Sequence, residues 1–206
     1  MTKHFRLKTH AFHHIPTNIK YLDIGCHHPV TGNNTYLFSL VGGQGLLVEP
    51  NSELHNLISE IRPQDSLFKG GISNTDGTQK YFYSEKSGLN TFSEKRNRNI
   101  TLTRNEKLSS MDKPILSIPS LLTKYKVKEL DVVSIDVEGL EEIVIESFFK
   151  QTSIRPKLFC IESNSCDTVN AEKHIIYKYF FKNNYFLYAS TGINFIFADK
   201  LTFDRC

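Results

Sequence analysis

Acidic side chains follow several apolar segments of the chain, at positions where they could meet a ligand. Glu49 ends the apolar run that starts at Gly45, and Asp136 and Glu138 follow another that starts at Leu130. Short, almost wholly apolar runs are typical of strands that helices cover on both faces, as in a parallel sheet. The carboxyl ends of such strands share one edge of the sheet, where open α/β folds bind ligands. We therefore expect the chemistry at this edge, although any single carboxylate there could simply cap a helix.

The first apolar segment ends in a turn typical of nucleotide binding. Asp23 and Gly25 end a strand predicted from Lys20, and a short helix is predicted over residues 35–40. A glycine after a strand lets a ligand approach the backbone closely, and the amides at the start of a helix point toward that ligand. Glu49 ends the next strand, where an acid accepts hydrogen bonds from the two hydroxyls of a ribose. Together these features predict an adenosine site.

The glycines that would hold a pyrophosphate are missing from this turn. Gly25 is followed by Cys-His-His-Pro-Val-Thr before Gly32, so the pattern G-x-G-x-x-G is absent. This disfavours a nicotinamide-dependent (NAD) oxidoreductase, which we keep as an alternative. S-adenosylmethionine carries no phosphate and needs one close backbone approach, an acid for its ribose and an anionic group near its sulfonium, a role that suits Asp23. A further alternative is a binding module that kept the fold and lost turnover.

Four segments resemble the FkbM-type S-adenosylmethionine-dependent methyltransferases. They are residues 21–25 (Tyr-Leu-Asp-Ile-Gly), 34–38 (Asn-Thr-Tyr-Leu-Phe), 45–50 (Gly-Leu-Leu-Val-Glu-Pro) and 134–139 (Ser-Ile-Asp-Val-Glu-Gly). The resemblance implies a Rossmann-like fold with a mostly parallel seven-stranded sheet, and O-methylation, often of a sugar in a glycan or another small acceptor. The residues expected to bind the cofactor are Asp23, Gly25, Cys26, Asn34, Thr35, Glu49, Pro50, Gly71, Ile72, Ser73 and Asp136, with residues 71–73 near the adenine.

Transfer of a methyl group to an oxygen needs an aligned acceptor and a group that takes its proton. Asp136 is the predicted base, with Glu138 as its neighbour. His27 and His28 are alternative bases, because the unperturbed pKa of histidine, about 6.5, lies near neutral pH. Each of these residues could instead serve the fold, the acids by capping a helix and the histidines by shaping a loop.

A divalent cation such as magnesium is a second way to activate the acceptor. Asp136, Glu162 and Asn164 look like the oxygen ligands of metal-dependent catechol-type methyltransferases. Hard oxygen ligands suit magnesium or calcium. The Glu-Ser-Asn spacing differs from an adjacent acid and amide, so a metal-free mechanism remains open.

Alternating strands and helices must position these residues. Hydrophobic periodicity predicts strands over residues 20–25, 45–49, 67–73, 80–84, 130–137, 157–162, 185–190 and 194–199, the last two as an antiparallel hairpin. Helices are predicted over residues 35–40, 50–60, 119–125, 140–148 and 171–181. This pattern describes an α/β fold in a single domain over residues 1–206.

The polar stretch 85–113 is expected to form a long loop or lid that binds the acceptor. Long loops over the strand ends of α/β folds often carry specificity. Its basic residues would favour an acceptor that bears phosphate, such as a nucleotide sugar, and a neutral glycan is the alternative. These residues are Lys95, Arg96, Arg98 and Arg104.

Composition limits the partners and the compartment. The 206 residues are 39% hydrophobic and carry a formal net charge of only +3, which gives little support for binding nucleic acid. No apolar run approaches the length of about 20 residues that a membrane helix needs. The cysteines, Cys26, Cys160, Cys166 and Cys206, form no C-x-x-C pair, which favours a reducing compartment such as the cytoplasm. No pattern indicates an oligomeric state.

Overall fold

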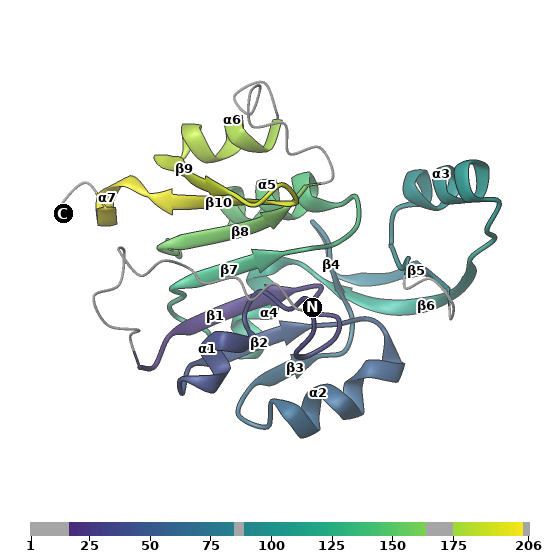
Figure 1. Ribbon diagram of the computed structural model, residues 1–206, viewed down its shortest axis with the longest axis horizontal. Helices are drawn as coiled ribbons and strands as arrows, with labels where there is room; N and C mark the ends of the chain where they lie inside the picture. The colour runs from purple at the N-terminus through teal and green to yellow at the C-terminus, as the bar shows by residue number, and fades with distance from the viewer. Residues whose placement is uncertain (1–16, 85–88, 164–174, 204–206) are drawn as a thin grey trace.

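The computed structural model describes residues 17–84, 89–163 and 175–203, and its largest feature is a seven-stranded sheet (Figure 1). The strand order is β3-β2-β1-β7-β8-β10-β9, and β10 alone runs antiparallel to its neighbours, β8 and β9. The strands are β1 (Lys20–Ile24), β2 (Gln44–Val48), β3 (Ser66–Phe68), β7 (Val132–Ile135), β8 (Leu158–Glu162), β9 (Tyr185–Ser190) and β10 (Asn194–Asp199). The predicted α/β fold, with its mostly parallel sheet and antiparallel C-terminal strands, is confirmed.

The strand order reverses between β1 and β7, because the chain passes outward to β2 and β3 and then returns to the other side of β1. Asp23 is in register with Leu47 on β2 and with Ser134 on β7. The carboxyl ends of these three strands are therefore level. A crevice opens at such a reversal, and ligands of open α/β sheets bind there.

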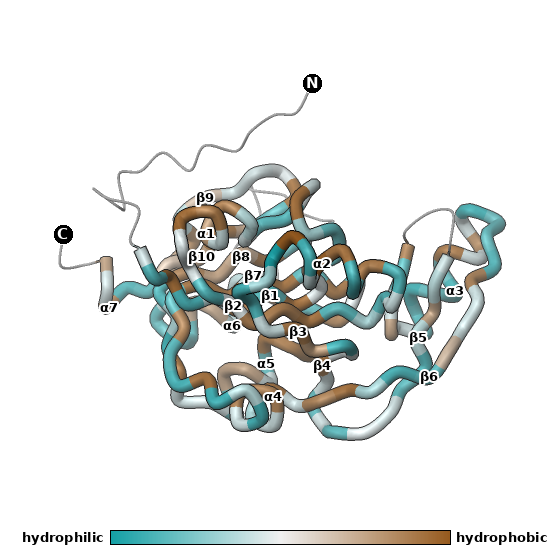
Figure 2. Tube along the Cα trace, turned by 90° about the horizontal axis from the view of Figure 1, so that it is seen from below, coloured by the Kyte–Doolittle hydropathy of each residue, from teal (hydrophilic) through white to brown (hydrophobic). Residues whose placement is uncertain are grey.

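Helices cover both faces of the large sheet, as the alternation along β1 requires. Leu22 and Ile24 pack in a cluster with α4, α5 and α6, whereas Tyr21 packs in a second cluster on the side of α1 and α2. Figure 2 shows hydrophobic segments inside the molecule and a more hydrophilic outer layer. The helices are α1 (Tyr36–Leu40), η1 (Ser52–Leu54), α2 (His55–Ile61), α4 (Ile118–Lys124), α5 (Glu141–Gln151), α6 (Ile175–Lys182) and α7 (Lys200–Phe203).

A second, smaller sheet extends to one side of the large sheet in Figure 1. It consists of β4 (Gly71–Ile72), β6 (Ser109–Leu116) and β5 (Gly77–Tyr83), in the order β4-β6-β5, and α3 (Glu94–Arg104) lies between β5 and β6 in the chain. The prediction of one strand over 67–73 is wrong, because the chain leaves the large sheet after β3 and enters the small one. At the crossing, a side chain on Gly70 would lie 2.3 Å from the carbonyl oxygen of Pro114, so only glycine fits.

The prediction of a loop over 85–113 is also wrong within the described residues, since α3 and the start of β6 occupy most of this stretch. α3 buries Ile100 and little else, so it lacks the apolar stripe that marks most helices. Its ends carry the missing signal: Ser93 caps the first turn by accepting a hydrogen bond from the Arg96 amide, and Asn105 adopts a left-handed conformation after the last.

Two further predictions concern the last long helix and membrane-spanning segments. The helix predicted over 171–181 corresponds to α6, and residues 171–174 lie outside the described residues. Among the helices that the structure describes, none is long and apolar enough to span a membrane.

Candidate functional site

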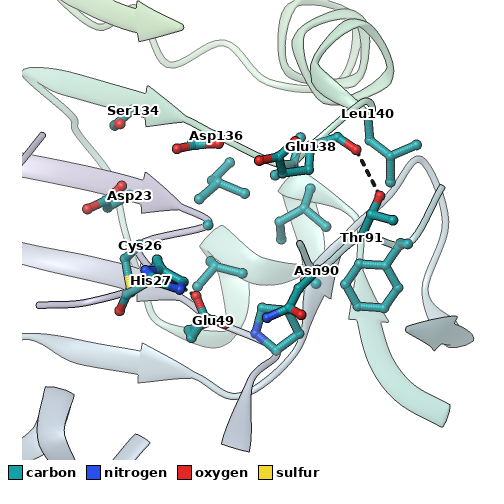
Figure 3. A pocket seen from close by; sticks show the side chains of 18 of the residues that line it. Asp23, Cys26, His27, Glu49, Asn90, Thr91, Ser134, Asp136, Glu138 and Leu140 are labelled. Atoms are coloured by element: carbon teal, nitrogen blue, oxygen red, sulfur yellow. Dashed lines mark hydrogen bonds between the residues drawn. The ribbon is translucent and has the colours of Figure 1, made fainter. Parts of the chain in front are cut away.

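A cavity of about 270 Å³ opens at the carboxyl ends of β1, β2 and β7, at the reversal of strand order (Figure 3). Residues of β4 and β5 and the segment 90–92 that follows β5 also line the cavity. Of the residues predicted to bind a cofactor, Asp23, Gly25, Cys26, Asn34, Glu49, Pro50, Gly71, Ile72 and Asp136 line this cavity. Thr35 is instead buried beneath Asp23, and Ser73 is paired through its backbone with Leu116.

Gly25 brings the turns after β1 and β7 into contact. Its φ of +81° is in the left-handed region, and a side chain there would lie 1.8 Å from the carbonyl oxygen of Asp136. The amide of Asp136 in turn donates to the carbonyl of Ile24. The requirement for glycine at this position therefore comes first from the approach of the β7 backbone, which seats Asp136 beside the cavity.

Glu49 is a buried carboxylate, only 3% exposed, that faces the cavity from the end of β2. One of its oxygens accepts a hydrogen bond from the His27 amide at 2.8 Å, and the other accepts from the Asn51 amide at 2.7 Å. Burial raises the pKa of Glu49 to about 7, and the charge of Asp23 adds to this effect. Each oxygen retains a lone pair, so the group can still accept two hydroxyl donors.

Asp23 belongs to a buried polar network beneath the cavity. Its Oδ2 accepts hydrogen bonds from Thr35 Oγ1 at 2.7 Å and from Asn33 Nδ2 at 3.1 Å. The guanidinium of Arg62 donates to Thr35 Oγ1 and to Asn33 Oδ1, each at 3.0 Å. Burial raises the pKa of Asp23, while the hydrogen bond from Thr35 and the charge of Arg62 oppose the rise. The network therefore fixes the Asp23 carboxyl group in one orientation.

Arg62 is the centre of this network, and the sequence gives little sign of its role. The residue is 1% exposed, its Nε donates to Asp65 at 2.7 Å, and its guanidinium lies 5.3 Å from the centre of the Tyr21 ring. The Tyr21 hydroxyl also donates to Asp65. An Arg and an Asp three residues apart after a helix normally form an exposed pair, because charged side chains are rarely buried. Sequence reasoning missed Arg62, Asp65 and Asn33 for this reason.

A second group of carboxylates lies at the ends of β7 and β8. Asp136, Glu138 and Glu162 each offer an oxygen, and these oxygens lie within 4.8 Å of one another. Burial raises the pKa of Asp136 well above its usual range, and a hydrogen bond with Glu162 and the charges of Glu162 and Glu138 add to the rise. Asp136 therefore lies against two other carboxyl groups, and these surroundings favour its protonated form.

Glu138 is held in an unusual conformation by contacts from the segment after β5. Its φ of +51° is left-handed, which is strained for a residue with a side chain. Thr91 Oγ1 donates to the Glu138 carbonyl at 2.8 Å (Figure 3), and Arg96 Nη2 lies 2.7 Å from its carboxylate. Burial raises the pKa of Glu138, and the charge of Arg96 opposes this effect. The small sheet and α3 are therefore tied to the acidic group.

The two histidines occupy different positions. His27 lines the cavity, and its backbone has a φ of +47° that directs its amide to Glu49. His28 is absent from the lining, and its Nδ1 accepts from the amides of Val30 and Thr31 at 3.2 and 3.0 Å. Its imidazole therefore stabilises the turn through the atom that would otherwise accept a proton. Of the two, His27 is the better placed for a role in the cavity.

Of the predicted metal ligands, Asp136 and Glu162 are brought together, and Glu138 joins them. Asn164 lies outside the described residues. Three carboxylates can bind a hard divalent cation, and they can equally share protons. The donor set is compatible with both.

Comparison with known proteins gives one match to a protein family. The model of the family described as "Methyltransferase FkbM domain" matches residues 23–187. No curated protein matches the chain.

Solved structures similar to this chain include three proteins at low sequence identity. The fibrillarin pre-rRNA processing protein of Methanococcus jannaschii is 11% identical with a TM-score of 0.44, and the match covers 89% of this chain and 67% of that one. Precorrin-6y C5,15-methyltransferase of Geobacter metallireducens is 10% identical with a TM-score of 0.43, over 88% and 79% of the two chains. A TehB-like SAM-dependent methyltransferase of Corynebacterium glutamicum is 11% identical with a TM-score of 0.42, over 90% and 82%.

Proposed function

The chain belongs to the family of FkbM methyltransferase domains, and from this premise we propose that it transfers a methyl group from S-adenosylmethionine to a hydroxyl of a small acceptor such as a sugar. One observation carries the proposal. Asp23, Glu49 and Asp136, from the ends of three neighbouring strands, converge on one cavity. That arrangement combines an acid for a ribose with an acid beside the acceptor.

The cavity suits an adenosyl ligand without phosphate. The free lone pairs of Glu49 can accept both hydroxyls of a ribose, and His27 is the only basic residue among the described residues that line the cavity. Pro50 and Ile72 offer apolar surface for a base, and Asp23 supplies negative charge for the sulfonium and amino group. When bound, S-adenosylmethionine supplies an electrophilic methyl group.

Asp136 is the residue we assign to the acceptor hydroxyl. Asp136 lines the cavity, and burial together with its hydrogen bond with Glu162 raises its pKa. In its ionised form the Asp136 carboxylate accepts a hydrogen bond from the acceptor hydroxyl, orients its oxygen and takes its proton. Glu138 lies close enough to add to the negative potential, and Arg96 keeps it in place.

The charges around this end of the cavity favour a neutral hydroxylated acceptor over one that bears phosphate there. Asp136, Glu138 and Glu162 are all acidic, and Arg96 is already paired with Glu138. An anion beside three carboxylates would be repelled. Carboxylates together with the amide of Asn34 can instead hydrogen-bond the hydroxyls of a sugar.

Two finer points belong to the same proposal. The three carboxylates could hold a divalent cation, in which case a chelator would abolish turnover and added magnesium would restore it. A cytoplasmic location is supported by Cys26, which is a free thiol in the described part of the chain.

The first test is calorimetric binding of S-adenosylhomocysteine to the wild-type protein and to Glu49→Gln. We expect micromolar binding by the wild type and a loss of about ten- to hundred-fold in the variant, since a hydrogen bond to a charged group contributes about 1.5–3 kcal/mol. Glu53→Gln, an exposed change in η1, is the control and should bind like the wild type. Absence of binding by the wild type at saturating ligand would refute the proposal.

The second test is transfer of a labelled methyl group to a panel of sugars, followed by mass spectrometry of the products. A methylated sugar is the expected result. Binding of S-adenosylhomocysteine without any product would favour the non-catalytic alternative. A fluorescence titration with NADH tests the oxidoreductase alternative, and we expect no binding.

A further inference from the structure

The small sheet contributes a wall to the cavity that neither the strand ends nor the acidic residues provide. Tyr81 on β5 and Phe92 shortly after it line the cavity, together with Asn90 and Thr91. Figure 3 shows that Thr91 reaches the loop that carries Glu138, and Asn90 hydrogen-bonds the Tyr81 side chain. The segment therefore contacts the acidic end of the cavity, and its aromatic residues need an explanation.

Phe92 packs directly on the backbone of β4. It is 7% exposed, and a side chain on Gly71 would lie 2.3 Å from its ring. The Tyr81 ring lies 5.0 Å from the Phe92 ring, between centres. Since Gly71 and Ile72 line the cavity as well, the two rings extend the apolar surface that these residues begin. A flat aromatic base is a suitable ligand for such a surface.

Tyr81 lines the same cavity as Glu49. Tyr81 is 3% exposed, and burial together with the negative charge of Glu49 raises its pKa. Asn90 hydrogen-bonds the Tyr81 side chain, and the Asn90 Oδ1 accepts from the Ser84 amide at 3.1 Å. Asn90 thus holds the phenol, which shares the cavity with the carboxylate that we assign to the ribose.

Pairing with β6 fixes the direction of these side chains. Tyr81 is opposite Met111 in the antiparallel ladder, and Thr91 pairs with Phe82 in an isolated bridge that folds the following segment back along β5. Both Tyr81 and Phe92 are thereby directed by the backbone of the small sheet. Their place in the cavity does not depend on a ligand.

We propose that the small sheet is part of the cofactor site, with Tyr81 and Phe92 forming the wall against which the adenosine of S-adenosylmethionine lies. The Tyr81 hydroxyl acts together with Glu49 on the ribose. This inference rests on the proposed function. Phe92 belongs to the stretch 85–113, which the sequence predicts to bind the acceptor. The inference gives this stretch a role in binding the cofactor instead.

The test compares two probes, S-adenosylhomocysteine and 5′-methylthioadenosine, which lacks the amino acid portion. We expect Tyr81→Phe to weaken both by about five-fold, because one neutral hydrogen bond is lost. Phe92→Leu should weaken both by about three-fold, since an aromatic contact is replaced by an aliphatic one. Tyr83→Phe is the matched control: it is the same change on the same face of β5, and Tyr83 does not line the cavity.

Each outcome decides the inference. Equal losses for the two probes in Tyr81→Phe, with no loss in Tyr83→Phe, support it. Wild-type affinity in Tyr81→Phe, or a loss confined to S-adenosylhomocysteine, overturns it, and a weakened Glu49→Gln would then leave the proposed function standing. If the wild type binds neither probe, the proposed function fails as well. Thermal unfolding checks each variant, and Tyr81→Phe alone decides if Phe92→Leu does not fold.

Discussion

The two ends of the cavity treat their carboxylates in opposite ways. At the end formed by β1 and β2, Asp23 and Glu49 each accept at least two hydrogen bonds from fixed donors. At the end formed by β7 and β8, Asp136 and Glu162 interact with each other, and the nearby cation contacts Glu138 instead. Both ends are acidic, yet among the described residues the carboxylates of the first end accept from amide and hydroxyl donors, whereas Asp136 of the second end contacts another carboxyl group.

The difference separates a group that binds from a group that reacts. A carboxylate held by several donors keeps its geometry without a ligand, so little ordering is required when a ligand arrives. A carboxyl group that lies against other carboxyl groups has a raised pKa and few fixed donors, and such groups are suited to general acid or base catalysis. The comparison therefore assigns cofactor binding to the first end and proton transfer to the second.

The comparison is tested most severely by Asp136→Asn. We expect kcat to fall by about 100- to 10,000-fold, the usual contribution of general acid or base catalysis, while the affinity for S-adenosylhomocysteine changes by less than about three-fold. Methyl transfer and calorimetry measure the two effects. Asp112→Asn, an exposed change on β6, is the control. A loss of binding as large as the loss of turnover would contradict the assignment of the two ends.

A second change removes the buried cation at the end of the cavity formed by β1 and β2. Arg62→Met should lower the free energy of unfolding by about 3–5 kcal/mol, because Asp23 and Asp65 would remain buried without their counter-ion. Urea denaturation measures this loss. Arg98→Met, which breaks an exposed pair with Glu94 on α3, should change it by less than about 0.5 kcal/mol. Equal effects in the two variants would show that the buried network is not what orders this end.

The smallest of the expected effects is a dependence of binding on pH. Ribose hydroxyls donate to an ionised Glu49, whose pKa is about 7 in the free protein. Ligand binding therefore favours the deprotonated form, and affinity falls as the pH decreases through 7, by about ten-fold between pH 8 and pH 6. Calorimetry with S-adenosylhomocysteine across this range measures the effect. Glu49→Gln should bind weakly with no such dependence, and a wild-type profile that is flat would contradict the placement of the ribose.

The strands of the large sheet were predictable because their signal is local. β2 and β7 are mostly apolar and are followed directly by acids, and this pattern is typical of strands buried on both faces. β4, β6 and α3 were missed because their sequences carry no clear local signal. β4 is only two residues long, and α3 buries one residue, so neither produces a periodic pattern that sequence reasoning can detect.

The residues of the site divide in the same way. The predicted edge of the sheet did bring Asp23, Glu49 and Asp136 to one cavity, and their roles stay predictions. No local pattern could have placed Arg62 beneath Asp23, because the contact depends on how α2 packs on β1. The same holds for Tyr81 and Phe92, which reach the cavity only through the pairing of β5 with β6.

The order of residues along this chain fixes which strands are buried, where each ends, and that acids and a glycine stand at those ends, since these properties depend on near neighbours. Folding in three dimensions decides which acids are satisfied and which are crowded. That distinction depends on the distances between groups far apart in the chain, such as Asp136 and Glu162 or Asp23 and Arg62. Electrostatic energies vary steeply with such distances and with burial, so the chemistry of the cavity is set by tertiary structure.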